Sequence, residues 1–170
     1  MMETIYFEKT KELKSNLHEL ERKLKVSLIL TGRKLTIEGS PLDEYEALRI
    51  LEAIHFGFSA KKALLLIDPE TIFKIIHIKE HSRKKNLYDV RARIIGTLGK
   101  TKRTIEEVSD TFIELKENDV GIIGSAEKIE EAITALTSLI RGAKQSNVYN
   151  FLEKMNKAKK SEGLGIKNKK

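Results

Sequence analysis

Two glycines three residues apart, Gly96 and Gly99, stand beside a cluster of basic side chains that could bind phosphate. Apolar residues at helical spacing precede and follow the pair, so the glycines predict a sharp loop between two helices, open to close approach. The helix after Gly99 would present free backbone amides next to Lys100, Lys102 and Arg103, and such amides bind phosphate oxygens. A Gly-x-x-Gly pair alone often marks an ordinary turn, but its place within a basic stretch indicates a phosphate-binding loop.

The positive charge of the chain is confined to two segments. Among 170 residues, 32 Lys and Arg stand against 25 Asp and Glu, which gives a net charge of +7. Residues 79–103 carry a net +7 and residues 154–170 a net +6, whereas the rest of the chain sums to −6. Such a concentration of charge is typical of a surface that binds nucleic acid. The alternative is that both segments are solvated faces that happen to be basic.

An internal repeat organises the elements that must position the loop. Residues 37–40 align with residues 122–125 at an offset of 85, and the same offset pairs Gly57 with Gly142. The apolar register holds over about 45 residues, so the chain reads as two copies of one unit.

The unit is predicted to have the order strand, helix, helix, strand, strand, helix, with one helix fewer before the hairpin of the first copy, and it folds as a three-stranded sheet with helices on one face. The fold class is therefore α+β, in two tandem units. Only the second copy has an added helix, over residues 83–95, and the glycine loop; the first has a single helix over residues 9–24. The strands are predicted at residues 5–7, 26–30 and 35–37 in the first copy, and at 72–78, 111–115 and 120–123 in the second.

Several kinds of site are excluded by composition and spacing. The chain has no Cys, which excludes a disulfide framework, a thiolate metal site and a cysteine nucleophile. Its four histidines lack metal-ligand spacing, and its paired acids have no nucleophile or metal partner. We therefore predict no catalytic residue, no metal and no cofactor. No apolar run approaches a membrane span and no secretory signal opens the chain, so we expect a cytoplasmic protein without a membrane partner.

The stretch from Ile95 to Thr101, with Ile105 and residues 111–115 behind it, resembles the RNA-binding KH domain of type I. Over roughly residues 3–155, the chain is similar to the archaeal Dim/Pno (partner of Nob-one) family of ribosome-assembly proteins. In that family a first KH unit lacks the glycine loop, a second carries it, and a segment resembling residues 142–153 closes the chain.

The resemblance implies a function and partners. It implies a non-enzymatic adaptor that binds single-stranded RNA near the 3′ end of small-subunit rRNA and assists its maturation. The implied partners are that rRNA region, a Nob-type endonuclease and the pre-ribosomal particle. Two alternatives stay open: a protein–protein scaffold that has lost RNA binding, and a KH subunit of an RNA-degrading or transcription complex.

The resemblance also implies roles for individual residues. The glycine loop would clamp the RNA backbone, the start of the next helix would contact phosphates, two arginines would extend the phosphate path, and apolar side chains would line or support a groove for bases. Many KH loops carry Lys or Arg between the glycines, so affinity here is expected to lean on the basic residues after the loop. The expected RNA-binding residues are Arg91, Arg93, Ile95, Gly96, Thr97, Leu98, Gly99, Lys100, Thr101, Lys102, Arg103 and Phe112, with Ile113 as the alternative to Phe112.

The first copy is expected not to clamp RNA. The repeat offset places residues 11–14 where the loop would fall, and a continuous helix does not present those amides. The predicted organisation is a degenerate KH-like unit at residues 1–68, a KH unit with a C-terminal helix at residues 69–155, and a basic disordered tail at residues 156–170.

Overall fold

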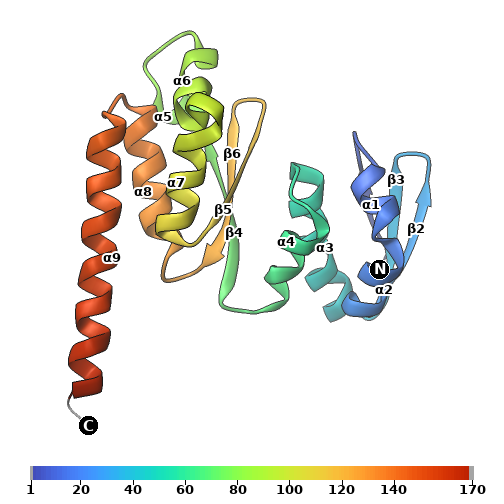
Figure 1. Cartoon of the computed structure of the whole chain (residues 1–170). Helices are drawn as coiled ribbons and strands as arrows, with labels where there is room; N and C mark the ends of the chain where they lie inside the picture. The colour runs from blue at the N-terminus through green and yellow to red at the C-terminus, as the bar shows by residue number, and fades with distance from the viewer. Residues whose placement is uncertain (1, 169–170) are drawn as a thin grey trace. The chain divides into compact units, whose positions relative to one another are not determined.

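Two three-stranded antiparallel sheets, one in each half of the sequence, organise the chain, with helices packed against each (Figure 1). The computed structural model describes residues 2–168 and divides into two units, residues 1–71 and 72–170. The division lies three residues after the boundary predicted between residues 68 and 69. The α+β class and the tandem architecture are confirmed.

The first unit has the sheet order β1-β3-β2. The helix predicted over residues 9–24 is two helices that break at Asn16, whose φ of −120° leaves the helical region. Ser40 caps the long helix after the hairpin, because its side chain accepts a hydrogen bond from the Asp43 amide. The elements are β1 (Glu3–Tyr6), α1 (Lys11–Ser15), α2 (Leu17–Leu24), β2 (Ser27–Thr31), β3 (Lys34–Glu38), α3 (Pro41–Phe56), α4 (Ala60–Ala63) and the 3₁₀ helix η1 (Leu64–Ile67).

The second unit has the equivalent sheet order β4-β6-β5. The helix predicted over residues 83–95 begins only at Leu87, and a separate short helix precedes it. The elements are β4 (Thr71–His77), α5 (Ile78–His81), α6 (Leu87–Ile95), the 3₁₀ turn η2 (Thr97–Gly99), α7 (Lys100–Ser109), β5 (Phe112–Lys116), β6 (Asp119–Ser125), α8 (Ile129–Ile140) and α9 (Gln145–Asn168).

Hydrogen bonds repeat at the offset of 85 residues, which confirms that the chain contains two copies of one unit. Glu21 Oε1 accepts from the Leu28 amide at 2.8 Å, and Glu106 Oε2 accepts from the Ile113 amide at 3.0 Å. Each carboxylate ties the helix before the hairpin to the first strand of that hairpin.

Close packing repeats as well. A Cβ on Gly39 would lie 2.9 Å from the Val26 side chain, and a Cβ on Gly124 would lie 2.7 Å from the Thr111 side chain. These distances are too short for a real Cβ, so both copies need glycine at the end of the second hairpin strand.

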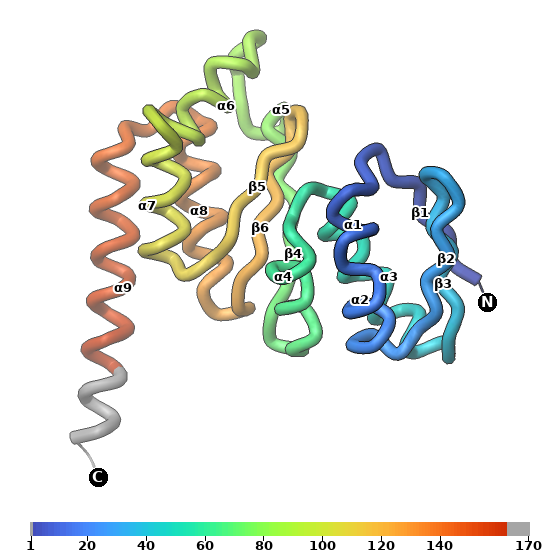
Figure 2. Tube along the Cα trace, turned by 45° about the vertical axis from the view of Figure 1, so that its right-hand side comes forward, coloured from blue at the N-terminus to red at the C-terminus, as the bar shows by residue number. Residues whose placement is uncertain are grey.

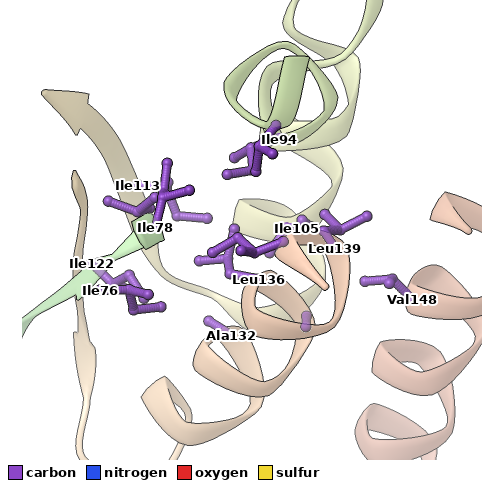
Figure 3. Packing of buried hydrophobic residues seen from close by; sticks show 14 of the residues in the cluster. Ile76, Ile78, Ile94, Ile105, Ile113, Ile122, Ala132, Leu136, Leu139 and Val148 are labelled. Atoms are coloured by element: carbon purple, nitrogen blue, oxygen red, sulfur yellow. The ribbon is translucent and has the colours of Figure 1, made fainter. Parts of the chain in front are cut away.

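The core of the second unit lies between its sheet and its helices (Figure 3). Ile94 of α6, Ile105 of α7, Leu136 of α8 and Ile122 of β6 belong to this cluster, and all four side chains are fully buried. This packing places the C-terminal end of α6 and the start of α7 on a rigid base.

The structure differs from the disordered tail predicted over residues 156–170, because α9 continues to Asn168. Residues 169 and 170 of that prediction lie outside the described residues. Val148 and Leu152 are buried along its first turns, and Lys159 Nζ lies 2.7 Å from Glu131 Oε1 on α8. α9 packs beside α7 and α8 (Figure 2). The lysine-rich composition did not indicate this helix, which contacts with neighbouring helices stabilise. Among the described residues, no helix has the length and apolarity needed to cross a membrane.

Candidate nucleic-acid interface

The glycine loop is a single turn in which three residues have positive φ. Gly96 ends α6 with φ of 76°, Leu98 follows with φ of 55°, and Gly99 precedes α7 with φ of 74°. The sharp turn between two helices is therefore as predicted. The Leu98 side chain is 92% exposed at the tip of the turn. An apolar side chain presented this openly is available to a ligand that lies across the loop.

Thr101 lies directly beneath the loop. A Cβ on Gly96 would be 2.2 Å from Thr101 Oγ1, so no other residue fits at Gly96. The Thr101 side chain is only 3% exposed, and its Oγ1 accepts hydrogen bonds from Gln145 Nε2 and the Tyr149 hydroxyl, each at 3.2 Å. The structure places this side chain beneath the loop and not on its surface, and the phosphate contact expected from Thr101 stays a prediction. Its hydroxyl ties the start of α9 to the base of the loop.

A groove of about 440 Å³ opens beside the loop. The loop and α7 form one wall and β5 forms the other. Apolar side chains and charged ones both line the groove, which suits the apolar face and polar edges of an unpaired base. The lining residues are Ile95, Leu98, Gly99, Lys102, Arg103, Glu114 and Leu115.

The cations at the groove differ in their intramolecular partners. Arg103 Nη2 donates to the Leu98 carbonyl at 3.0 Å, so this arginine holds the tip of the loop. Lys102 Nζ lies 3.5 Å from Glu106 Oε1 one turn along α7. Lys100 is exposed at the start of α7. All three bring positive charge to the end of the loop where phosphates would lie.

Arg91 and Arg93 do not line the groove. Arg93 donates to the Leu139 carbonyl at 3.1 Å and also to the Ala143 carbonyl, at the C-terminal end of α8. Arg91 donates to the Glu117 carbonyl in the β5–β6 turn at 3.1 Å. Both guanidinium groups thus connect α6 to other elements. The two arginines were predicted to contact RNA because of their charge. The carbonyl groups to which they donate are brought near them only by the fold.

Phe112 is 36% exposed at the start of β5 and does not line the groove. The alternative, Ile113, is fully buried in the core. Glu114 and Leu115, which the sequence reasoning missed, form this wall. Their position in a predicted strand was the only signal, and it does not say which part of the strand faces α7. The Glu114 carboxylate can accept hydrogen bonds from base amino groups.

The first unit has a helix at the equivalent place. Residues 11–15 form α1, where Leu13 is fully buried and Glu12 Oε1 accepts from the Ala60 amide at 2.8 Å. This segment therefore packs against its own unit and presents no glycine turn. In the described part of the chain, no group of three or more His, Asp or Glu side chains could hold a metal ion.

Sequence comparisons find relatives with KH domains. Residues 72–157 match the eukaryotic type KH domain (KH-domain type I), in the form of the second KH unit of PNO1. A KH domain-containing protein of Methanocaldococcus jannaschii is 32% identical over 142 residues, 79% of this chain and 63% of that protein. The pre-rRNA-processing protein pno1 of Emericella nidulans is 29% identical over 130 residues, 74% of this chain and 50% of that protein. The chain thus spans about half to two thirds of the length of these curated relatives.

Solved structures share both units. Dim2p from Pyrococcus horikoshii has a TM-score of 0.79 at 29% identity, covering 91% of this chain and 99% of that one. A chain of the a/eIF2alpha–aDim2p–rRNA complex from the same organism has a TM-score of 0.80 at 28% identity, covering 93% and 95%. A protein of unknown function from Aeropyrum pernix has a TM-score of 0.80 at 28% identity and matches over both full lengths.

Proposed function

This chain belongs to the PNO1-type family of KH domains, and from that premise we propose that it is a single-stranded RNA-binding adaptor in small ribosomal subunit assembly. In this proposal it binds near the 3′ end of small-subunit rRNA, on the cytoplasmic pre-ribosomal particle, and assists maturation beside a Nob-type endonuclease. It positions RNA and does not itself cleave it. The names of two relatives support the proposal: pno1 is a pre-rRNA-processing protein, and aDim2p forms a complex with rRNA.

One observation carries the proposal: the glycine turn and the groove meet at the same residues. Leu98 and Gly99 belong to the turn and also line the groove. An RNA strand whose sugar-phosphate backbone crosses the turn therefore has its bases directed into the groove. Amides at the start of α7 and the charge of Lys100, Lys102 and Arg103 would bind the phosphates.

The groove also suggests how bases are read. Glu114 is an acceptor opposite the cations of α7. A carboxylate accepts from the exocyclic amino groups of cytosine and adenine, whereas a uracil carbonyl in the same place would face it unfavourably. The proposed strand is therefore one in which amino-bearing bases occupy the groove.

Fluorescence anisotropy with a short single-stranded RNA that ends in the small-subunit 3′ sequence tests the proposal. Thr97→Asp with Leu98→Asp should weaken binding at least about tenfold, because two negative charges would face the phosphates. The matched control is Lys11→Ala with Lys14→Ala, which lowers the net charge by the same two units at the equivalent place in the first unit. That control should bind like the unmodified chain. Unchanged affinity of the Asp variant would overturn the loop mechanism.

A further inference from the structure

A second cavity, separate from the groove, is lined by positively charged side chains that do not line the groove. Arg83 and Lys84 in the α5–α6 connection and Arg141 at the end of α8 line a cavity of about 430 Å³, together with His81. We call it the α5–α8 cavity. Its remaining wall includes Ile140, and none of the described residues that line it is acidic. Arg141 belongs to residues 104–153, a stretch of net charge −6. The fold nevertheless places it beside Arg83 and Lys84, which belong to the basic segment of residues 79–103.

The three cations lack intramolecular counter-ions. Within the described residues, the side chains of Arg83, Lys84 and Arg141 form no ion pair and no hydrogen bond; the Lys84 backbone amide donates to the Ser82 hydroxyl at 3.1 Å. Three like charges gathered around one hollow repel each other, and a bound anion relieves that repulsion.

The end of α8 does not account for these charges. The C-terminal end of a helix is negative and attracts cations. Arg93 already supplies that cation, because it donates to the carbonyls of Leu139 and Ala143 at this end. Arg141, Arg83 and Lys84 are therefore available to an external ligand.

We propose that the α5–α8 cavity binds phosphates of an RNA segment outside the part that the groove holds. The inference rests on the proposed function. The two sites share no lining residue. The α5–α6 connection precedes α6 and the glycine loop follows it, so the nine residues of α6, ~13 Å of helix, lie between them. The connection and the α8–α9 turn lie at the same end of this unit (Figures 1 and 2).

Arginine and lysine favour phosphate as the occupant. Guanidinium groups bind phosphate oxygens in pairs, and lysine adds a compact charge that suits a polyanion. A partner segment of protein would need large apolar side chains to pack against, and Ile140, the large apolar residue in this lining, is itself buried. Because one chain would hold two parts of the same RNA, the second contact would raise affinity only for RNAs long enough to reach both.

The test compares two RNAs on the full chain by fluorescence anisotropy over a salt series. One is the short 3′ sequence; the other is the same sequence extended by about thirty nucleotides. In Arg83→Ala/Lys84→Ala/Arg141→Ala, affinity for the longer RNA should fall about tenfold, and the slope of log Kd against log salt should fall by about two. Affinity for the short RNA should stay within about twofold.

Two control proteins accompany the triple variant. Lys9→Ala/Lys34→Ala/Lys61→Ala removes three exposed lysines of the first unit, giving the same net charge, and should bind both RNAs like the unmodified chain. Arg83→Lys/Arg141→Lys keeps the charge and should retain most of the affinity for the longer RNA.

Three results would each overturn the proposal: full affinity of the triple variant for the longer RNA, equal losses in the lysine control, or an equal loss for the short RNA. Failure of the proposed function reads out separately, as absence of short-RNA binding by the unmodified chain.

Discussion

Gly96 and Gly99 both have positive φ but differ in what surrounds them. A Cβ at Gly96 would meet the Thr101 side chain and also its backbone nitrogen at 2.7 Å, whereas a Cβ at Gly99 would meet nothing within 4 Å. Gly96→Ala should therefore reduce the free energy of unfolding by roughly 2–4 kcal/mol, and Gly99→Ala by only about 1 kcal/mol. Urea denaturation of the two variants measures both values, and Gly99→Ala is the control for adding a Cβ at positive φ. Equal losses would contradict the close contact with Thr101.

For individual residues, the sequence predicts roles that follow from residue type, and it does not predict roles that depend on hydrogen-bond partners distant in the sequence. The two glycines and their turn were predicted, since positive φ favours glycine locally. Thr101 and Arg93 were assigned to RNA because they lie near the loop and, for Arg93, carry charge. Their hydrogen-bond partners, Tyr149 and Leu139, are more than forty residues away in sequence. No local pattern contains such a contact.

At the scale of elements, α9 connects to the loop through a short chain of contacts. Tyr149 and Gln145 donate to Thr101 Oγ1, and Thr101 packs under Gly96. A buried hydroxyl that loses one donor still keeps the other, so removing a single donor should loosen the loop without unfolding the unit.

Tyr149→Phe should therefore weaken binding of the short RNA about threefold to fivefold while lowering the free energy of unfolding by about 1 kcal/mol. Amide hydrogen exchange in residues 97–100 should become faster, a change that a merely structural defect elsewhere would not produce. The matched control is Tyr88→Phe, because Tyr88 is exposed and its ring lies near Arg91 instead. Faster exchange without weaker binding would show that the position of the loop does not limit affinity.

The elements themselves were largely predictable, and their departures have physical causes. Strand alternation and the repeat located all six strands, because each copy must bury one face of its sheet. The helical structure of the tail was not predicted, because its many lysines suggest disorder. In the structure Lys159 pairs with Glu131, and the apolar residues of α9 pack on neighbouring helices. Helix stability there comes from tertiary contacts, which composition does not report.

At the scale of the whole molecule, the two copies have diverged in charge. Residues 1–71 carry a net −1 and residues 72–170 a net +8, which together give the +7 of the chain. The helix that replaces the glycine loop in the first unit is held by Leu13 and by the Glu12 hydrogen bond. An unfavourable charge and a closed helix both oppose RNA binding in that copy.

One short RNA should therefore bind per chain, and isothermal titration calorimetry measures this directly. A single clamp predicts a stoichiometry of one and a single transition, because only one of the two repeats has both the turn and the surrounding cations. Lys11→Ala with Lys14→Ala in the first unit should leave the stoichiometry and the binding enthalpy unchanged, whereas Thr97→Asp with Leu98→Asp should remove most of the heat. Two RNAs per chain, with the second lost in the first-unit variant, would mean that the helix in that copy binds RNA by a surface other than a glycine turn. The number of RNAs bound per chain therefore tests whether only the second repeat binds RNA, because the two repeats share one sheet order and both could otherwise bind.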